Sequence, residues 1–499
     1  MLDETMMADI AAYRARLSPE RPALAFEGRW YSYAEVHQRV CQLASKLAEA
    51  GVRAGDRVSI LAFNHLAHVE LLLATAKLGF IYTPLNYRYS ALEQRQVCKD
   101  IQPRLLFYDR EHSQEAETTA VPSICLDDYP SYLASANDTP LPAWQAQADS
   151  IQMILFTGGT SGFSQGAMQP YRQSFFNAVN TVFSWGLRPE DATIQATPCF
   201  HAGINALSMP LFYLGGRVVI ARHFQPSDYL RSVAQERISL LFMVPTMYQM
   251  LSEDPDFAHS DLSSVRWAIS GGAPCPEPVR QAFAARDIRF KQGYGLTEAG
   301  VNCFSIDLDD AEAKPHSVGR PVLYSQAVLR DDSGQAVAPG EVGELTLRGP
   351  HVFSGYYNNI QASAIAFRQN RDWLWTGDLA QQDEEGFFTI VGRRKEMFIS
   401  GGENVYPLEI EHALYQHPAI AECAVMGVPD TRWGEVGLAA VVLREQAKLD
   451  AESLRSYLKE RLARYKVPKH ILIQHSLPKS AAGKILKKDI SSAFLESQT

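Results

Sequence analysis

The chain has 499 residues, of which 46% are hydrophobic and 21% are charged. These values are typical of globular proteins and exclude a disordered or fibrous chain. Lys and Arg number 47 against 56 Asp and Glu, and the formal net charge of -9 disfavours a nucleic-acid binder, which needs a basic face. The length predicts about two to four domains.

Neither the N-terminus nor the hydropathy indicates export or a membrane segment. The first residues, MLDETMMADIAAYRARL, lack the basic and apolar regions of a signal peptide, and no run of about eighteen uncharged apolar residues occurs. We expect a cytoplasmic protein without integral membrane association. The 7 cysteines are scattered without a CxxC pair, so we expect small buried side chains, not disulfides or zinc ligands.

The first clear element is a helix expected over residues 32–51. Ser32 followed by Glu35 is the pattern of a capping box at its start, and Gly51 is a stop signal. Its apolar residues recur at helical spacing: Val36, Val40, Leu43 and Leu47.

Short apolar runs then alternate with segments of helical length. The runs are RVSILAF (57–63), PRLLFYD (103–109), MILFT (153–157), GRVVIA (216–221), LLFMVP (240–245) and VRWAISGG (265–272). This alternation is typical of parallel strands joined by crossover helices. The large N-terminal part is therefore predicted to be α/β.

After about residue 320, glycine and proline clusters separate short strands such as ELTLRG (344–349) and FFTIVG (387–392), which predicts a β-rich lobe. The pattern changes again after Arg393. We expect a large domain over residues 1–393 and a small one over residues 394–499.

The small C-terminal domain is predicted to be α+β. AECAVMGVPD (421–430), LAAVVL (438–443) and HILIQ (470–474) have the composition of strands. LRSYLKERLARYKVP (454–468) has helical periodicity and ends in Pro468.

A glycine-rich segment, LFTGGTSGFSQGAMQ (155–169), follows the MILFT run. Its glycines let backbone N–H groups approach a ligand, and its hydroxyls add donors, which suits a nest for phosphate oxygens, with an ordinary glycine-rich turn as the alternative. The GK[ST] end of a Walker loop and the GxGxxG of a dinucleotide site are both absent. Gly162 to Gly166 matches the GxSxG of α/β-hydrolases, with Ser164 as nucleophile. Four residues separate this match from its strand, so a serine hydrolase is the weaker alternative.

Seven segments in order carry a resemblance to the adenylate-forming enzymes, in particular the acyl-CoA synthetases, over nearly the whole chain. They are TGGTSGFSQGAMQ, PCFHAGINAL, ISGGAP, QGYGLTEAG, WTGDL, GRRKEMFISGGENVYPLEIE and LPKSAAGKILKK. The resemblance implies that ATP and a carboxylic acid form an acyl-adenylate and pyrophosphate, after which the thiol of CoA attacks the activated carbonyl. It also implies that the small domain is mobile and that the cofactors are ATP, Mg²⁺ and CoA.

The resemblance implies the nucleotide site residue by residue. Lys484 would bridge the acid carboxylate and the α-phosphate, Glu298 would hold Mg²⁺, and Thr297 would donate to the α-phosphate. Asp378 and Arg393 would bind the ribose. The other implied contacts to ATP or AMP are Thr157, Gly158, Gly159, Thr160, Ser161, Gly162, Gln165, Gly271, Gly272, Ala273, Gly293, Tyr294 and Gly295.

The resemblance also implies an acid pocket, a hinge and a CoA channel. Lys395 would be the hinge of the small domain, and residues 400–402 (Ser400, Gly401 and Gly402) would line the channel for CoA. Amino-acid-activating relatives need an aspartate near residues 200–203, where this chain has none, so a fatty or aromatic acid is implied. A separate acyl carrier protein as acceptor and a homodimer are left open. The implied acyl pocket is His201, Ala202, Gly203, Ala273 and Val301.

The glycine-rich loop departs from the family pattern. The family has a lysine two residues after a proline, whereas this chain has Ser164 and Gln165 near that place. Gln165 can donate a hydrogen bond, but without the strengthening that a charged donor gives. We therefore expect weak binding of ATP, and a non-catalytic relative that only binds a nucleotide or an acyl ligand stays an alternative.

Overall fold

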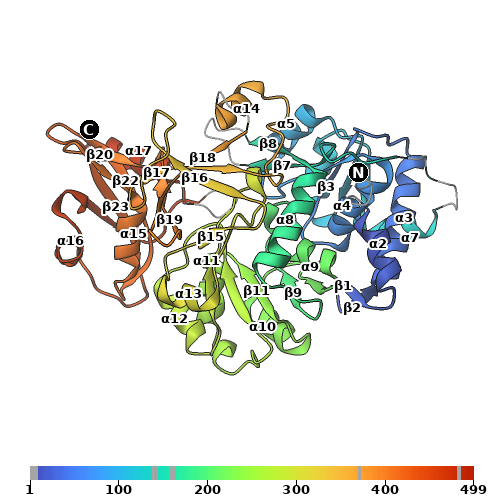
Figure 1. Ribbon diagram of the computed structural model, residues 1–499, viewed down its shortest axis with the longest axis horizontal. Coiled ribbons are helices and arrows are strands. Elements are labelled where there is room, and N and C mark those ends of the chain that lie inside the picture. Colours follow the sequence, from blue (N-terminus) through green and yellow to red (C-terminus); the bar gives the residue numbers. More distant parts are fainter. Residues whose placement is uncertain are drawn as a thin grey trace. The chain divides into compact units, whose positions relative to one another are not determined.

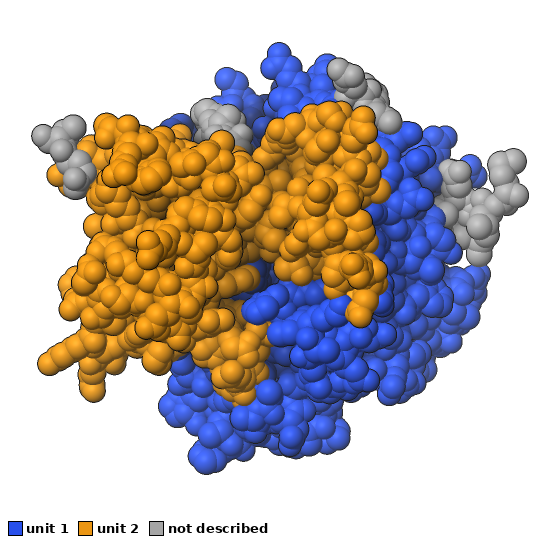
Figure 2. Space-filling view, turned by 60° about the vertical axis from the view of Figure 1, so that its left-hand side comes forward, with its two compact units in different colours: residues 1–274, 283–327, 347–374 blue, residues 275–282, 328–346, 375–499 orange. Residues whose placement is uncertain are grey.

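The computed structural model describes residues 9–136, 141, 144–157, 164–368, 372–479 and 485–498. The chain divides into two compact units (Figure 2). The first unit consists of residues 1–274, 283–327 and 347–374, and the second of residues 275–282, 328–346 and 375–499. The domain boundary expected at residue 393 stays a prediction.

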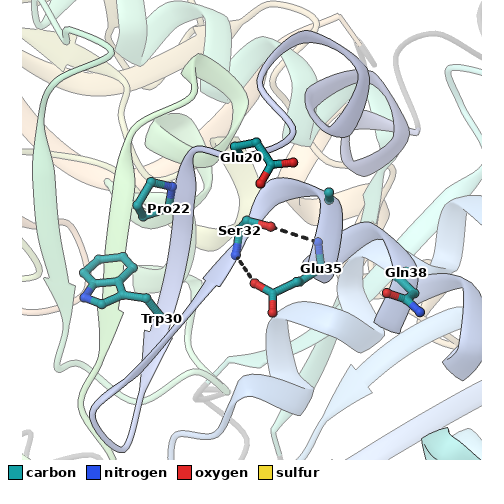
Figure 3. Close-up of a pocket in the computed structure, with 7 residues that line it drawn as sticks. Glu20, Pro22, Trp30, Ser32, Glu35 and Gln38 are labelled. Carbon is teal, nitrogen blue, oxygen red and sulfur yellow. Dashed lines mark hydrogen bonds between the residues drawn. The ribbon is translucent and has the colours of Figure 1, made fainter.

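The expected N-terminal helix is α3 (Tyr33–Glu49), and its four periodic apolar residues are all buried. The hydroxyl of Ser32 accepts from the backbone N–H of Glu35 at 3.2 Å, and the N–H of Ser32 donates to the carboxylate of Glu35 at 2.7 Å (Figure 3). These two bonds confirm the capping box. The same residues lie in the wall of a surface hollow whose lining also includes Glu20, Trp30 and Gln38.

The first unit contains a seven-stranded sheet in the order β13-β12-β11-β9-β10-β1-β2, of which β11, β9, β1 and β2 are labelled in Figure 1. All of its pairs are parallel except β1 with β2. Strands β9 and β12 are buried along their whole length and β11 at all but one residue, as expected for a parallel sheet covered by helices. The strands are β1 (Pro22–Phe26), β2 (Arg29–Ser32), β9 (Ala192–Gln195), β10 (Arg217–Ile220), β11 (Leu240–Met243), β12 (Trp267–Ser270) and β13 (Phe290–Gln292).

A six-stranded sheet of the same unit has the order β6-β5-β3-β4-β7-β8. Its pairs are parallel except the hairpin of β7 with β8, which flanks the glycine-rich loop. The strands are β3 (Arg57–Leu61), β4 (Ile81–Pro84), β5 (Leu105–Tyr108), β6 (Ser123–Cys125), β7 (Ile151–Thr157) and β8 (Gln165–Pro170). All six apolar runs expected to be strands are strands, so the α/β prediction is confirmed.

Helices and one short antiparallel pair of strands complete this part of the chain. The pair is β14 (Phe304–Ser305) with β15 (Arg320–Pro321). The other α-helices are α2 (Ile10–Leu17), α4 (Leu66–Leu78), α5 (Ala91–Ile101), α6 (Ser113–Thr118), α7 (Tyr129–Ala134), α8 (Tyr171–Ser184), α9 (Ser208–Leu214), α10 (Pro226–Gln235), α11 (Pro245–Glu253), α12 (Glu277–Ala284), α13 (Leu308–Ala313) and α14 (Ile360–Phe367).

The second unit is built on two smaller sheets. One has the order β16-β17-β18-β19, and the other has the order β21-β20-β23-β22 with β24 parallel to β23. The strands are β16 (Gln326–Arg330), β17 (Val342–Arg348), β18 (Leu374–Gln382), β19 (Phe388–Arg393), β20 (Phe398–Ser400), β21 (Glu403–Val405), β22 (Ile420–Asp430), β23 (Gly434–Leu443) and β24 (His470–Gln474). Its helices include α15 (Pro407–Tyr415), α16 (Ala451–Lys459) and α17 (Lys487–Gln498). The expected β-rich lobe and α+β region are both present.

The helix expected over residues 454–468 is wrong in its extent. It begins earlier, at Ala451, because the carboxylate of Asp450 caps it by accepting from the N–H of Ser453 at 2.7 Å. It ends at Lys459, and the following residues turn so that Leu462 and Val467 pack against the same core. The regular spacing of the leucines arises because they all pack against one core. Residues in a turn can pack against that core as well as residues in a helix.

All seven cysteines are free, and five of them are buried as expected. Cys41 and Cys125 are only half-buried, so the expectation of burial is wrong for these two.

Within the described ranges, no helix is long and apolar enough to cross a bilayer.

Candidate active site

Three of the implied site segments follow parallel strands of the seven-stranded sheet. Residues 271–273 follow β12, residues 293–295 follow β13, and residues 200–203 follow β9 after a short loop. Strands β9, β11, β12 and β13 run in the same direction, so their carboxyl ends lie along one edge. Open α/β sheets bind ligands at this edge. The fold therefore brings the implied adenine wall and acid segment to the edge where a ligand is expected.

The glycines of these segments are required by the protein's own packing. A Cβ added to Gly271 would lie 2.8 Å from Cε2 of Phe242, and one on Gly295 would lie 2.0 Å from the carbonyl oxygen of Val301. Gly272 has a φ of +82°, in the left-handed region that favours glycine. Val301 packs partly against the core, while Ala273 is exposed. The protein's own packing and backbone conformation thus already require glycine at these positions, whether or not a ligand binds.

Residues 293–298 form a half-buried strip between buried neighbours. Tyr294 packs edge-on against the ring of Phe304, with 5.7 Å between the ring centroids. Thr297 and Glu298 lie in a short 3₁₀ turn (Thr297–Ala299). This strip holds three implied nucleotide residues on one continuous piece of backbone.

Glu298 and its neighbour are held from two sides. The carbonyl oxygen of Thr297 accepts from the side-chain amides of Gln169 at 3.0 Å and Gln173 at 2.9 Å. The hydroxyl of Tyr356 donates to Oε1 of Glu298 at 2.8 Å, and the N–H of Phe353 donates to the carbonyl oxygen of Glu298 at 2.8 Å. The carboxylate therefore has a fixed position before any cation binds.

The base of the glycine-rich loop is a regular hairpin in which Thr157 pairs with Gln165. The hydroxyl of Ser164 hydrogen-bonds the hydroxyl of Tyr89. A serine nucleophile of a hydrolase would need a histidine as partner instead. The implied loop residues Gly158, Gly159, Thr160, Ser161 and Gly162 lie outside the described residues, and so does Lys484.

Strand β8, which leaves this loop, is hydrogen-bonded to residues 355–357, and this segment also contacts Glu298. The N–H of Met168 in β8 donates to the carbonyl oxygen of Gly355 at 2.9 Å, and the N–H of Tyr357 donates to that of Gly166 at 2.8 Å. Tyr356, between them, reaches Glu298. One hydrogen-bonded cluster therefore joins the glycine-rich hairpin to the implied magnesium ligand. Tyr356 is not among the residues predicted from the sequence, although the aromatic pair in SGYYNN is a usable signal.

His201 is the implied residue at the mouth of the acid pocket. Burial lowers its pKa to about 4, and the positive charge of Arg88 acts in the same direction. Its ring lies against that of Phe200, with 4.2 Å between centroids, and it precedes the 3₁₀ turn Ala202–Asn205. The imidazole is therefore neutral at pH 7 and suits an uncharged part of a substrate.

Phe242, which the sequence analysis missed, lies between two implied site glycines. Its ring comes within 3.5 Å of a Cβ position on Gly203 and within 2.8 Å of one on Gly271. The ring is half-buried at the end of β11. An aromatic surface therefore separates the implied acid segment from the implied adenine wall.

Neutrality of His201 has a testable consequence. Replacing His201 by alanine is expected to raise the KM for the acid by a factor that stays constant between pH 6 and pH 8. The reason is that a group with a pKa of about 4 does not change its charge in that range. The measurement is the acid KM of both proteins across that range. A factor that falls steadily toward pH 6 would show that the imidazole titrates there and would contradict the prediction.

Asp378 and Arg393, the implied ribose ligands, face each other across β18 and β19. Nε of Arg393 lies 2.7 Å from Oδ1 of Asp378; the carboxylate is 4% exposed and the guanidinium side chain 45% exposed. A buried carboxylate can accept two hydroxyl donors, and a neighbouring exposed guanidinium can add donors of its own. The chemistry of the pair fits a ribose.

The implied hinge, Lys395, is exposed between two anchored neighbours. Arg394 forms an ion pair with Glu344 at 2.8 Å, and the carboxylate of Glu396 accepts from Nζ of Lys487 at 2.8 Å. A backbone rotation at residue 395 would therefore turn one anchored segment against another.

Residues 400–402 form the turn between β20 and β21. Ser400 is buried, and both glycines have positive φ, +62° at Gly401 and +90° at Gly402. A Cβ on Gly401 would also lie 2.9 Å from Cε3 of Trp433. The hairpin itself requires these glycines, and their role in a CoA channel stays a prediction.

Fixing the hinge should separate the two half-reactions. We expect the change of Lys395 to proline, which fixes φ near -65°, to leave acid-dependent pyrophosphate exchange within about twofold and to lower CoA thioester formation by at least about tenfold. Lys395→Ala, which removes the charge and keeps the rotation, is the control. Equal rates of thioester formation in the proline variant and the parent protein would rule out the hinge.

The fold and this site define an adenylate-forming enzyme, and the chain belongs to that family. Residues 12–357 match the family model for AMP-binding enzymes, and residues 409–484 match the model for the C-terminal domain of AMP-binding enzymes. The chain is an AMP-forming acid-thiol ligase, because its curated relatives over nearly the full length are CoA ligases.

The relatives include a feruloyl-CoA synthase of Amycolatopsis sp, 38% identical over 96% of this chain and 97% of that protein. An indoleacetate–CoA ligase of Aromatoleum aromaticum is 35% identical over 95% of this chain and 96% of its own length. The solved structure of the o-succinylbenzoate CoA synthetase of Bacillus subtilis with ATP and a magnesium ion matches with a TM-score of 0.87. It is 31% identical and covers 96% of this chain and 98% of that one.

The expected cofactors of this family, ATP, Mg²⁺ and CoA, agree with these relatives. In the described part of the chain no three His, Cys, Asp or Glu side chains gather into a metal cage. A single positioned carboxylate, Glu298, fits Mg²⁺, which is usually held by one or two carboxylates together with substrate phosphates.

Proposed function

We propose that this enzyme activates an aromatic or fatty acid that carries no amino group and transfers the acyl group to CoA. The observation that carries the proposal is the surface at the carboxyl edge of the sheet. It combines a neutral His201, the bare backbone of Gly203 and Gly271, and the ring of Phe242. Such a surface suits a flat apolar group and offers no carboxylate to an ammonium.

The proposed roles follow from the charges of the reactants. An acid carboxylate that attacks an α-phosphate brings two anions together, so the site must supply positive charge. Lys484 would lie against both anions, and Glu298 would hold Mg²⁺, which neutralises phosphate charge when bound. Asp378 and Arg393 would orient the ribose. For the second step CoA supplies the thiol, and rotation at Lys395 would bring residues 400–402 to the acyl group.

An acid panel tests the proposal. The protein would be incubated with ATP, Mg²⁺ and CoA and with single acids: a hydroxycinnamic acid, indoleacetic acid, a benzoic acid, fatty acids of several lengths, and phenylalanine. We expect pyrophosphate and an acyl-CoA with at least one of the aromatic or fatty acids and none with phenylalanine. Activity with the amino acid alone, or acyl-CoA from none of the aromatic or fatty acids, would overturn the proposed substrate class.

The identity of the acceptor, the cytoplasmic location and a homodimer stay predictions. A carrier protein bearing phosphopantetheine, tested beside free CoA in the same panel, separates the two acceptors.

The missing loop lysine gives a prediction of its own. The change Gln165→Lys is expected to lower the KM for ATP about three- to tenfold, because a charged donor binds a phosphate oxygen about twice as strongly as a neutral one. The KM for ATP is measured at saturating acid. Gln165→Met, which removes the donor, should raise it. If all three proteins share one KM, the backbone donors suffice and the side chain plays no part.

A further inference from the structure

Helix α8 carries a row of buried polar side chains. Gln173, Asn177, Asn180 and Thr181 are each at most 3% exposed. A helix buried in a core usually presents apolar residues there, because an amide without partners loses its hydration. The row therefore requires an explanation, the more so because one polar atom each of Gln173, Asn177 and Asn180 has no hydrogen-bond partner among the described residues.

Asn177 lies between the two backbone segments that the proposed mechanism must align. Its Nδ2 donates to the carbonyl oxygen of Asn205 at 2.7 Å, at the end of the 3₁₀ turn that follows His201. Its Oδ1 lies 2.9 Å from the position that a Cβ on Gly300 would take, two residues after Glu298. One side chain thus hydrogen-bonds the acid segment and lies beside Gly300, in the segment that follows the implied magnesium ligand, where its Oδ1 accepts no hydrogen bond from the described residues.

Asn302 and Thr181 extend this contact. Nδ2 of Asn302 donates to Oγ1 of Thr181 at 2.6 Å and to the carbonyl oxygen of Ala206 at 2.8 Å. The hydroxyl of Thr181 in turn donates to the carbonyl oxygen of Asn177 at 2.7 Å. We call Asn177, Thr181 and Asn302 the amide node. It joins α8, the chain after His201 and the chain after Glu298 through side chains buried from water.

We infer that the amide node positions the acid segment against the segment of Glu298, and that Asn177 is its principal positioning residue. The inference rests on the proposed function. Asn177 contacts backbone rather than reacting atoms, so its effect on the reaction passes through residues 201–205 and 298–300. Displacement of either segment would move the acid carboxylate relative to the α-phosphate, and small displacements of aligned reactants are costly.

The same helix provides a matched control. Asn180 is of the same residue type and is also buried, at 0% exposed against 3% for Asn177. Its Oδ1 accepts from the N–H of Tyr324 at 3.0 Å, in a segment outside the implied site. Loss of either amide removes a hydrogen bond from α8, but only loss of Asn177 removes a bond to the acid segment and the packing beside Gly300.

The experiment compares Asn177→Ala and Asn180→Ala in the full-length protein. Thermal unfolding midpoints, the KM values for acid and ATP, and kcat of acid-dependent pyrophosphate exchange are measured for both. We expect both variants to lose thermal stability. Only Asn177→Ala should raise the acid KM, by about tenfold, as for the loss of one buried hydrogen bond of about 1.4 kcal/mol. Its kcat should fall as well.

The outcomes separate the two claims. If the wild-type protein is active and the two variants have equal acid KM values, the positioning role is overturned, because the substitutions then changed only the stability of the protein. Wild-type protein without acid-dependent exchange overturns the proposed function and the inference with it. Should Asn177→Ala fail to fold, Thr181→Val, which keeps the side-chain shape and removes the hydroxyl, must raise the acid KM at least about threefold. An unchanged acid KM in that variant overturns the inference.

Discussion

Replacing Lys484 by alanine is expected to lower the rate of acyl-adenylate formation by at least about 100-fold, which is the scale of losing one electrostatic group aimed at the transition state. The physical reason is the repulsion between the attacking carboxylate and the α-phosphate, which the lysine would offset. The measurement is acid-dependent pyrophosphate exchange. Thioester formation from supplied acyl-adenylate should survive, because that step no longer brings two anions together.

Lys488→Ala is the matched control for Lys484→Ala. Lys488 lies four residues further along the chain and is exposed, so its removal tests for a general effect of charge. Pyrophosphate exchange in this variant should stay within about twofold of the parent protein, as for most surface substitutions. If Lys484→Ala lowered both half-reactions equally, the lysine would be structural or shared between the steps, and the assigned role would fail.

Replacing Glu298 by glutamine should lower adenylation about 100- to 1,000-fold at millimolar Mg²⁺, because an amide oxygen is a weaker ligand for a hard cation than a carboxylate. The change keeps the shape of the side chain and leaves an oxygen that the Tyr356 hydroxyl can reach. Raising the Mg²⁺ concentration should recover part of the lost rate. The measurement is pyrophosphate exchange as a function of Mg²⁺.

Two controls accompany the Glu298 variant. Glu253→Gln removes an exposed carboxylate at the end of α11 and should leave the Mg²⁺ dependence unchanged. Binding of MgATP by calorimetry gives a readout that does not depend on turnover, and Glu298→Gln should weaken it. A Glu298→Gln protein that retains normal exchange and normal MgATP affinity would show that the cation is held elsewhere.

Local sequence patterns were sufficient to predict much of the fold. Helix α3 has both a capping box and a regular apolar stripe, and strand β12 is a compact, mainly apolar run followed by two glycines, so each carries its own signals. The helix over residues 454–468 misled because Leu462 and Val467 face the same core as the helix without belonging to it. The spacing of apolar residues shows which residues are buried. It predicts the secondary structure only where the backbone conformation is regular.

The site was predictable where its residues lie in sequence motifs and not where the fold alone brings them together. Asp378 and Arg393 were assigned to one ligand, and the structure places them 2.7 Å apart. Phe242 and Asn177 have no motif of their own, and Tyr356 has only the aromatic pair in SGYYNN as a signal. Their positions depend on the ends of β11, the pairing beside β8 and the buried face of α8, which arise only from tertiary packing.

The central claim is that an oxygen of the acid attacks the α-phosphorus of ATP. The most direct measurement uses an active acid from the panel with both carboxyl oxygens labelled by ¹⁸O, followed by mass spectrometry of the nucleotide after one turnover with CoA. One labelled oxygen is expected in AMP and none in pyrophosphate. Label in inorganic phosphate with release of ADP, or AMP without label, would contradict it.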